Sequence, residues 1–435
     1  MKISMVSEHA SPLAAIGGVD AGGQNVHVAE LAKALAARGH EVAVYTRKDD
    51  RELPERVTVA EGYDIVNISA GPPELIPKDE LLPFIPALAD GITASWRHDA
   101  PDVVHGHFWM SGVASIDAVQ QLSLDLAEPP RMAQTFHALG SVKRRHQGIK
   151  DTSPEEREWM EPWVGRAADR VIATCTDEAF ELKSLGVDRS RISIVPCGVD
   201  TGMFTPRGRA ETRTSRYRIV TVGRLVPRKG MDTIIQALAT LKELGVADTE
   251  LWVVGGGSGA EALGDDAEVR RLSSLASDVG VSSHVKFIGQ VPRERMPAVL
   301  RSADVVVCTP WYEPFGIVPL EAMGCGIPVI ASAVGGLVDT VTDGVTGLHV
   351  PPKDPDALAQ ALAELLPQPN ILRSFGRAGV SRVRSRYTWE RIAADTERIY
   401  ELMMGRESKR TEALEAVRRR VVRSDGSGFG RSWAQ

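Results

Sequence analysis

The sequence has few of the features that mark secreted, membrane or disulfide-rich proteins. It contains four cysteines in 435 residues, and aromatic residues make up only 5%. No apolar run reaches the roughly 18 residues of a membrane-spanning helix, and the apolar start is too short for a secretory signal. The cysteines show no CxxC spacing, which predicts reduced core thiols and not disulfides or zinc ligands. We therefore expect a cytoplasmic protein without a transmembrane segment.

The sequence also lacks a strong excess of one charge. Lys and Arg number 51 against 57 Asp and Glu, which gives a formal net charge of -6. Nucleic acid is therefore not expected as a partner, because general nucleic-acid binders carry a basic footprint. Apolar residues make up 43%, and a chain of this length is expected to bury large cores in two or three domains.

The first half of the chain alternates short β-branched runs with amphipathic helical stretches. This alternation is typical of a parallel sheet covered by helices. Residues 2–6 and 42–45 predict strands on either side of a glycine-rich loop and a helix that ends near Gly39. Further strands are predicted at residues 102–105, 170–174 and 191–195.

The pattern lapses where Pro and Gly cluster between residues 196 and 209, which indicates a domain boundary. A second alternation follows, with strands predicted at 219–222, 251–254, 285–288, 305–307 and 329–331. The predicted fold class is α/β, with two Rossmann-like, doubly wound parallel-sheet domains over residues 1–205 and 206–387. Residues 406–435 are charged and Arg-rich, and they are predicted to be a disordered tail.

Glycine clusters follow strands in both halves, at residues 17–23 and 255–259. Glycines let a phosphate reach backbone amides and a helix dipole, which favours an anion by up to ~2 kcal/mol. Neither cluster matches GxGxxG or a P-loop, so a tight turn is an equally open interpretation of each.

A basic segment, Gly223 to Gly230, also follows a predicted strand and precedes a helix. Arg224 and Lys229 are thereby placed at the carboxyl edge of the sheet, where a pyrophosphate would bind. Arg offers a planar fork and Lys a point charge to phosphate oxygens. A solvated basic turn is the alternative.

Two carboxylates eight residues apart, Glu313 and Glu321, bracket the start of a helix predicted near Ile317. Glu321 falls inside an apolar helix, where an unpaired charge would cost several kcal/mol. Sugar hydroxyls would satisfy it. A structural ion pair for Glu321 is the alternative interpretation.

These motifs together resemble the family-four glycosyltransferases. The resemblance rests on Glu-x7-Glu after Arg-x4-Lys, a leading Gly-Gly loop and a Gly-Val-Asp segment, and it covers nearly residues 1–404. It is closest to the branch of sucrose-phosphate synthase and D-inositol-3-phosphate glycosyltransferase, through segments 20–25, 78–83 and 105–109. It implies the GT-B fold, with the active site in the cleft between the domains and helix 388–404 crossing back to the first.

The resemblance also implies a retaining transfer from a nucleotide-diphosphate sugar, UDP- or GDP-linked, as co-substrate, with no other cofactor and no metal. Arg224 and Lys229 would hold the diphosphate with the Gly23 amide, and Glu321 would bind the ribose. The implied catalytic residues are Arg224, Lys229, Glu313 and His107. The implied donor-binding residues are Gly22, Gly23, Gly223, Gly257, Phe315, Gly316, Ile317 and Glu321.

Two features could suggest a metal site. His105 and His107 point to the same side of a strand, but no third ligand is evident nearby. The Asp354-Pro-Asp356 triplet precedes a helix predicted at 357–366 and is interpreted as a helix cap.

The acceptor is less well defined, and its predicted contacts lie in the first half. They are His9, Asn25, Lys78, Thr135, Lys143 and Arg157. A basic run at 143–146 could meet a phosphorylated acceptor, and a solvated basic face is equally open. Inositol-phosphate enzymes usually carry Tyr where this chain has Phe108, so hydroxyl, thiol and amine acceptors of specialised metabolism stay open.

Other classes fit less well. A nicotinamide-dependent oxidoreductase should carry GxGxxG and an acidic residue at the end of the second strand. A non-catalytic nucleotide-sugar binder should lack the sugar-facing groups, yet Glu313 and His107 are present. A phosphorylase would need a recognisable lysine for pyridoxal phosphate. The sequence leaves a monomer and a homodimer open.

Overall fold

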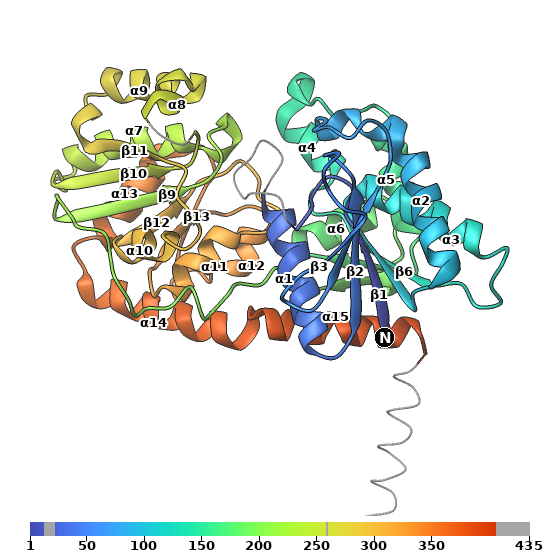
Figure 1. Ribbon diagram of the computed structural model, residues 1–435. Helices are drawn as coiled ribbons and strands as arrows, with labels where there is room; N and C mark the ends of the chain where they lie inside the picture. Colours follow the sequence, from blue (N-terminus) through green and yellow to red (C-terminus); the bar gives the residue numbers. More distant parts are fainter. Residues whose placement is uncertain (13–21, 258–259, 406–435) are drawn as a thin grey trace, which may run out of the picture.

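The computed structural model describes residues 1–12, 22–257 and 260–405. The chain forms two lobes, each built on a twisted sheet (Figure 1). The tail and most of the first glycine cluster lie outside the described residues, so the predictions for them stay predictions. Within the described residues no helix is long and apolar enough to cross a membrane, and the four cysteines are unpaired.

The first sheet has the strand order β3-β4-β2-β1-β5-β6-β7-β8 in the described part of the chain. All its pairings are parallel except that of β3 with β4. Met5 lies between Val44 and His105 in the register of the central strands. The strands are β1 (Lys2–Val6), β2 (Glu41–Arg47), β3 (Arg56–Thr58), β4 (Asp64–Ile68), β5 (Val103–His107), β6 (Arg131–Thr135), β7 (Arg170–Ala173) and β8 (Ile192–Ile194).

Apolar side chains cover both faces of this sheet. The neighbours Val103 and Val104 belong to different buried clusters, because successive strand residues point to opposite faces. The helices are α1 (Gly23–Ala37), α2 (Ile85–His98), α3 (Trp109–Leu122), α4 (Gly140–Gln147), α5 (Arg157–Ala167) and α6 (Thr176–Ser184). Short turns of 3-10 helix are η1 (Lys78–Glu80), η2 (Leu82–Phe84), η3 (Gly148–Lys150) and η4 (Arg189–Arg191).

The second sheet is parallel throughout and has the order β11-β10-β9-β12-β13-β14. Its strands are β9 (Tyr217–Val222), β10 (Thr249–Val254), β11 (Val285–Gly289), β12 (Val305–Cys308), β13 (Val329–Ser332) and β14 (Gly347–Val350). The helices are η5 (Pro227–Lys229), α7 (Met231–Glu243), α8 (Ala260–Asp265), α9 (Ala267–Asp278), η6 (Ser282–His284), α10 (Met296–Arg301), α11 (Ile317–Gly324), α12 (Gly336–Thr340), α13 (Pro355–Leu365) and α14 (Pro369–Arg386).

The last helix, α15 (Trp389–Met403), returns to the first lobe, as Figure 1 shows. Its apolar face packs against α1 and joins the buried cluster under the first sheet, through Ile392 and Tyr400. The two segments that link the lobes run side by side, because the Val199 amide donates to the Tyr387 carbonyl at 2.8 Å.

Most predicted elements are present. Gly39 has a φ of +86° directly after α1, and Asp354 caps α13 by accepting from the Ala357 amide at 2.9 Å. β5 extends to His107, two residues beyond the predicted strand. The strands β3, β4, β6 and β14 were not predicted.

Candidate active site

The two sheets bring their carboxyl edges together, and the predicted site residues gather there. In a doubly wound sheet, ligands bind where the strand order reverses. That point lies between β1 and β5 in the first sheet and between β9 and β12 in the second. The residues on the donor side come from these four strands: Gly23 follows β1, His107 ends β5, Lys229 follows β9 and Glu313 follows β12.

The basic segment after β9 lies against the loop after β12. The Lys229 ammonium forms an ion pair with Glu313, and the Trp311 amide donates to the Arg228 carbonyl at 2.9 Å. Gly230 has a φ of +68°, and a Cβ there would lie 2.0 Å from the Thr309 carbonyl oxygen. Only glycine therefore allows this turn to approach the β12 loop.

Glu313 is largely buried among cations. Desolvation raises the pKa of this carboxyl, but Lys229, Arg228 and Arg224 outweigh it and hold the pKa below its ordinary value. The side chain of Glu313 is 16% exposed, whereas Arg224 is exposed. Glu313 is therefore an ionised acceptor at neutral pH, and the cations around it can meet an anion.

The helix α11 starts four residues after Glu313. Its N-cap, Gly316, has a left-handed φ of +77°, and a Cβ there would lie 2.9 Å from the Thr340 hydroxyl. The Gly336 amide donates to the Glu313 carbonyl at 2.8 Å and so supports this loop from α12. The first amides of a helix lack partners within it and attract anions.

Glu321 lies inside α11 and is 6% exposed. It accepts from Arg293 at 3.2 Å, which is the ion pair that the sequence left open as an alternative. Burial raises the pKa of Glu321 to about 7, although Arg293 opposes the shift. The carboxylate can therefore exchange a proton near neutral pH.

The first lobe meets this loop through α1 and an aromatic cluster. A Cβ on Gly23 would lie 3.3 Å from Ile317 and 3.5 Å from the Phe315 ring. The Phe315 ring also lies 5.1 Å from His137 and 6.0 Å from His27, measured between centroids. Gly23, Phe315 and Ile317 are thus brought together across the two lobes.

Four buried imidazoles lie behind this contact. His107 Nδ1 is 2.9 Å from His137 Nε2, and the rings of His105 and His107 are 4.1 Å apart. Burial lowers the pKa of His107 and of His137 well below the ordinary value, and that of His27 to about 4. The imidazoles are therefore neutral. Among the described residues, His107 Nε2 and His137 Nδ1 have no hydrogen-bond partner, so both nitrogens keep hydrogen-bonding capacity for a ligand.

His105 has a fixed tautomer. The Thr135 hydroxyl donates its single proton to the Ile172 carbonyl at 3.1 Å, so it must accept from His105 Nε2 at 2.9 Å. The Tyr400 hydroxyl then donates to His105 Nδ1 at 2.7 Å. This series of hydrogen bonds connects α15 to the buried histidines. It engages the Thr135 hydroxyl inside the lobe, so the hydroxyl is not presented to an acceptor.

His137 was not among the residues predicted for the site. It follows β6, as His107 ends β5, and both His137 and Phe108 have positive φ, +62° and +81°. Strained non-glycine residues often lie at functional sites. Gln134 holds one of these turns by donating to the Phe108 carbonyl at 2.9 Å.

Several predicted acceptor contacts gather around Phe108. The Arg157 guanidinium lies 5.0 Å from the Phe108 ring centroid, and the His9 ring is also 5.0 Å from it. Arg157 is buried and forms an ion pair with Glu161 at 3.0 Å. His9 contacts Glu8 at 2.7 Å. The Arg157 guanidinium is therefore already paired with the Glu161 carboxylate where it lies beside Phe108.

Lys143 is also paired. Its ammonium lies 2.9 Å from Asp151 and donates to the Ser153 hydroxyl at 2.8 Å. Asp79 is 3.8 Å away, and it follows Lys78 in η1. Lys143 and Arg157 thus share Ser153 as a partner, and each is paired with a carboxylate.

Three other predicted residues have mainly backbone roles in the described structure. Asn25 is 3% exposed, accepts from the Gly22 amide and donates to the Ser11 carbonyl, both at 3.0 Å. It therefore fixes the start of α1 and does not face an acceptor. Gly257 accepts from the Gln290 amide at 3.3 Å, and residues 258–259 lie outside the described residues.

No three His, Cys, Asp or Glu side chains form a potential metal site within residues 1–12, 22–257 and 260–405.

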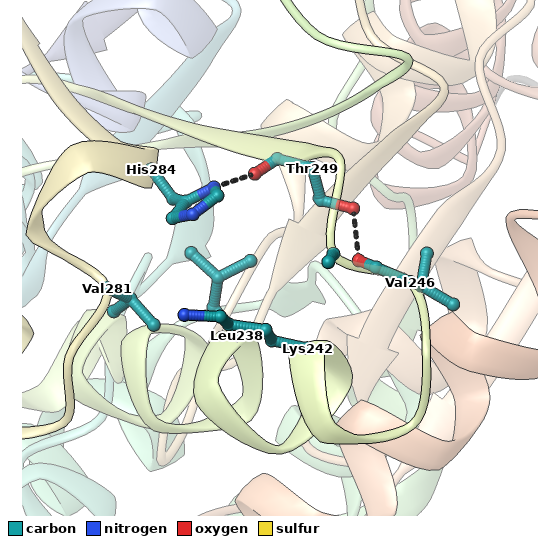
Figure 2. A pocket seen from close by; sticks show the side chains of 7 residues that line it. Leu238, Lys242, Val246, Thr249, Val281 and His284 are labelled. Carbon is teal, nitrogen blue, oxygen red and sulfur yellow. Dashed lines mark hydrogen bonds between the residues drawn. The ribbon is translucent and has the colours of Figure 1, made fainter.

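Figure 2 shows a small hollow between α7, β10 and η6, lined in part by Lys242 and His284. These residues lie at the amino ends of β10 and β11, so the hollow is at the opposite edge of the sheet from the site.

Comparison with known proteins extends over both lobes. A family model described as Glycosyltransferase Family 4 matches residues 21–202, and one described as Glycosyl transferases group 1 matches 206–382. The D-inositol 3-phosphate glycosyltransferase of Acidothermus cellulolyticus is 35% identical over 434 residues, 97% of this chain and 94% of that protein. The corresponding enzyme of Xylanimonas cellulosilytica is 37% identical over 410 residues, 90% and 94% of the two chains.

A solved structure is also similar to this chain over nearly its whole length. Sucrose-phosphate synthase from Thermosynechococcus elongatus superposes with a TM-score of 0.82 at 33% identity, covering 93% of this chain and 99% of that one. Along the chain, the first lobe, the second lobe and the helix that returns to the first follow one another as in the GT-B fold. The chain therefore belongs to the family-four glycosyltransferases and has their GT-B fold.

Proposed function

We propose that this glycosyltransferase moves a sugar, with retention, from a UDP- or GDP-sugar to a small polar acceptor and needs no metal. The observation that carries the proposal is the cationic loop of Arg224, Arg228 and Lys229 against Glu313. Each hydrogen bond to a charged group contributes about 1.5 to 3 kcal/mol. Two such cations can stabilise a departing diphosphate without a divalent ion.

Each of the donor-binding residues is proposed to contact the part of the donor that suits its chemistry. Arg224 and Lys229 bind the diphosphate, together with the amides of Gly23 and of the α11 start. Glu321 accepts from the ribose hydroxyls, and Glu313 accepts from hydroxyls of the transferred sugar. The neutral imidazoles of His107 and His137 supply the remaining sugar contacts through their unpartnered nitrogens.

The proposed reaction is a front-face displacement. The bond from the anomeric carbon to the diphosphate oxygen breaks, and the acceptor atom bonds to the same face. The acceptor proton passes to the departing phosphate oxygen, and the nucleoside diphosphate leaves. Lys229 and Arg224 stabilise the negative charge that develops on the leaving group. NMR of the product tests this step, because an inverted anomeric centre would exclude it.

A thermal-shift panel tests the donor site first. UDP, GDP, ADP and NAD are compared, each with and without magnesium. A ligand at 100 times its dissociation constant adds ~2.7 kcal/mol, which shifts the melting temperature of a protein of this size by several degrees. We expect one of UDP and GDP to stabilise the protein without magnesium. Stabilisation by NAD alone would overturn the proposal.

For the acceptor we propose a phosphorylated polyol. Two relatives in the comparisons are named for inositol 3-phosphate and for sucrose phosphate synthesis. Lys78, Lys143 and Arg157 supply three cations on the first-lobe side. The test is a transfer screen with D-inositol 3-phosphate and fructose 6-phosphate against the same compounds without phosphate.

A non-phosphorylated acceptor is the second candidate, and a specific observation favours it. Arg157 and Lys143 already pair with Glu161 and Asp151, and Phe108 has no hydroxyl to offer a phosphate. Hydroxyl, thiol and amine compounds of specialised metabolism belong to this class. Equal transfer to phosphorylated and dephosphorylated acceptors in the same screen would select it.

Nucleotide affinity should depend on pH through Glu321. Its pKa is raised to about 7 by burial, so the ionised form that accepts two ribose hydroxyls is favoured as the pH rises through 7. We expect the association constant of UDP or GDP to rise by up to about tenfold from pH 6 to pH 8. Isothermal calorimetry measures it.

The Glu321→Gln variant is the control for this effect. It keeps the size of the side chain but cannot titrate. Any rise in the association constant with pH that remains in this variant therefore comes from titration of the diphosphate itself. An identical pH dependence in the wild type and in Glu321→Gln would remove Glu321 from the proposed ribose site.

A further inference from the structure

Tyr312 connects the second lobe to helix α4 of the first. It lies directly before Glu313 and is 8% exposed. Its hydroxyl accepts from Gln147 Nε2 at 2.8 Å, and its ring stacks on His146 with centroids 5.0 Å apart and an interplanar angle of 24°. Gln147 is the last residue of α4, so both contacts cross between the lobes.

On the second lobe, Tyr312 is part of the cationic loop. The Arg228 guanidinium lies 5.3 Å from the Tyr312 ring centroid. The backbone on either side is tied down as well, because Trp311 donates to the Arg228 carbonyl and Glu313 pairs with Lys229. A displacement of Tyr312 therefore displaces the carboxylate next to it.

On the first lobe, the same face of α4 reaches the acceptor cluster. Lys143 and Gln147 are four residues apart, so they lie on one face of the helix, one turn from each other. Lys143 contacts Asp151 and Ser153, while Gln147 contacts Tyr312. One helix thus touches the predicted acceptor site at one end and the donor loop at the other.

We propose that Tyr312 is a positioning residue that fixes the acceptor helix α4 relative to Glu313. The inference rests on the proposed function, because it assumes that the acceptor binds beside Lys143 and the transferred sugar beside Glu313. With Tyr312 in contact with α4, the acceptor atom and the anomeric carbon are held in register and water has less access to the bound sugar. Without it, each substrate still binds its own lobe, but the two are less often aligned.

The lobes are also joined by contacts outside α4. The Thr176 amide donates to Asp339 at 2.6 Å, and the Thr174 hydroxyl donates to the Pro314 carbonyl at 3.3 Å. Both start from the β7–α6 connection. Loss of the Tyr312 contacts should therefore loosen α4 against the donor loop while the lobes stay associated.

Amide hydrogen exchange on the full-length protein tests the contact without any acceptor. Tyr312→Phe removes the hydrogen bond and keeps the ring, and Gln147→Ala removes the same bond from the other side. We expect each to raise exchange about two- to tenfold both in α4 and in residues 309–316, because one neutral hydrogen bond is lost. Arg145→Ala is the matched control, since Arg145 pairs with Glu181 inside the first lobe.

The control should raise exchange in α4 alone. Exchange at 309–316 that stays at the wild-type rate in Gln147→Ala would overturn the proposal. The double variant supplies a second criterion, because it should exchange no faster than either single variant if both remove one interaction.

Steady-state kinetics distinguish positioning from a merely structural contact. With the acceptor found in the transfer screen, Gln147→Ala and Tyr312→Phe should lower kcat/KM for acceptor about two- to tenfold. They should also raise the fraction of donor that is hydrolysed, while the Kd of UDP or GDP stays within twofold. Kinetics equal to those of the wild type would exclude a positioning role. Failure of every nucleoside diphosphate to bind the wild type would instead overturn the proposed function.

Discussion

Turnover of the Lys229→Ala variant is expected to fall by about 10²- to 10³-fold, as for the loss of one preorganised transition-state donor. Lys229 is the cation that contacts Glu313, and it belongs to a turn that Gly230 holds against the β12 loop. In the proposed reaction its ammonium binds the diphosphate and also meets the additional negative charge that develops as the diphosphate leaves. The loss of this transition-state contact should appear in kcat, which steady-state assays at saturating donor and acceptor measure.

Lys242→Ala is a suitable control for this prediction. Lys242 is a lysine of the same lobe, but it lines the hollow of Figure 2 at the opposite edge of the sheet. Its loss should leave kcat unchanged. Lys229→Ala combined with Glu313→Gln should cost less than the product of the single effects, because the two side chains act as a pair. Unchanged turnover in Lys229→Ala would refute the assignment of the clamp.

Much of the fold could be predicted because its signals are local. The strand β9 is a β-branched run followed directly by glycine, and α1 ends at a glycine with positive φ. The strand β6 escaped prediction because it reads Arg-Met-Ala-Gln-Thr, with no β-branched run. Its Gln134 is fully buried because it supports the turn at Phe108, a tertiary requirement that periodicity does not reveal.

The same distinction applies to the site. Residues 223–230 and 313–321 are each contiguous, so the sequence could offer them as a pyrophosphate clamp and a pair of carboxylates, with a basic turn and a structural ion pair as alternatives. Arg293 and His137 were not found, because their roles depend on partners brought together by folding. Thr135 shows the converse. It ends β6 at the correct edge of the sheet, but its hydroxyl accepts from His105.

The largest loss of stability is expected from Arg218→Met, far from the site. Arg218 is fully buried at the start of β9 and lies opposite Glu250 of β10 in the strand register. Its guanidinium contacts Glu250 at 2.7 Å and donates to Ser302 at 2.8 Å. Removing one partner of a buried pair costs about 3 to 5 kcal/mol, because the other charge stays buried.

A thermal scan at pH 7 measures this loss. The melting transition that involves the second lobe should fall by roughly 6 to 20 °C, at about 2 to 4 °C per kcal/mol. Arg213→Met is the control, because Arg213 pairs with Asp304 at 3.0 Å but is 35% exposed. An exposed pair contributes about 1 kcal/mol or less.

The pH dependence and a double variant show whether the buried charge is the cause. Burial raises the pKa of Glu250, but hydrogen bonds from Lys286, Thr214 and Arg218 outweigh it and lower the pKa to about 2. Since that value lies below the ordinary 4.5, ionised Glu250 stabilises the fold above pH 4.5, and this stabilisation is lost as the pH falls toward 2. In Arg218→Met, the loss of stability as the pH falls from 4.5 toward 2 should be smaller than in the wild type.

Arg218→Met with Glu250→Met should recover much of the stability at pH 7, because an apolar pair of similar volume leaves no charge buried. A double variant as unstable as the sum of the two single variants would mean that packing, and not the ion pair, sets the stability of this edge.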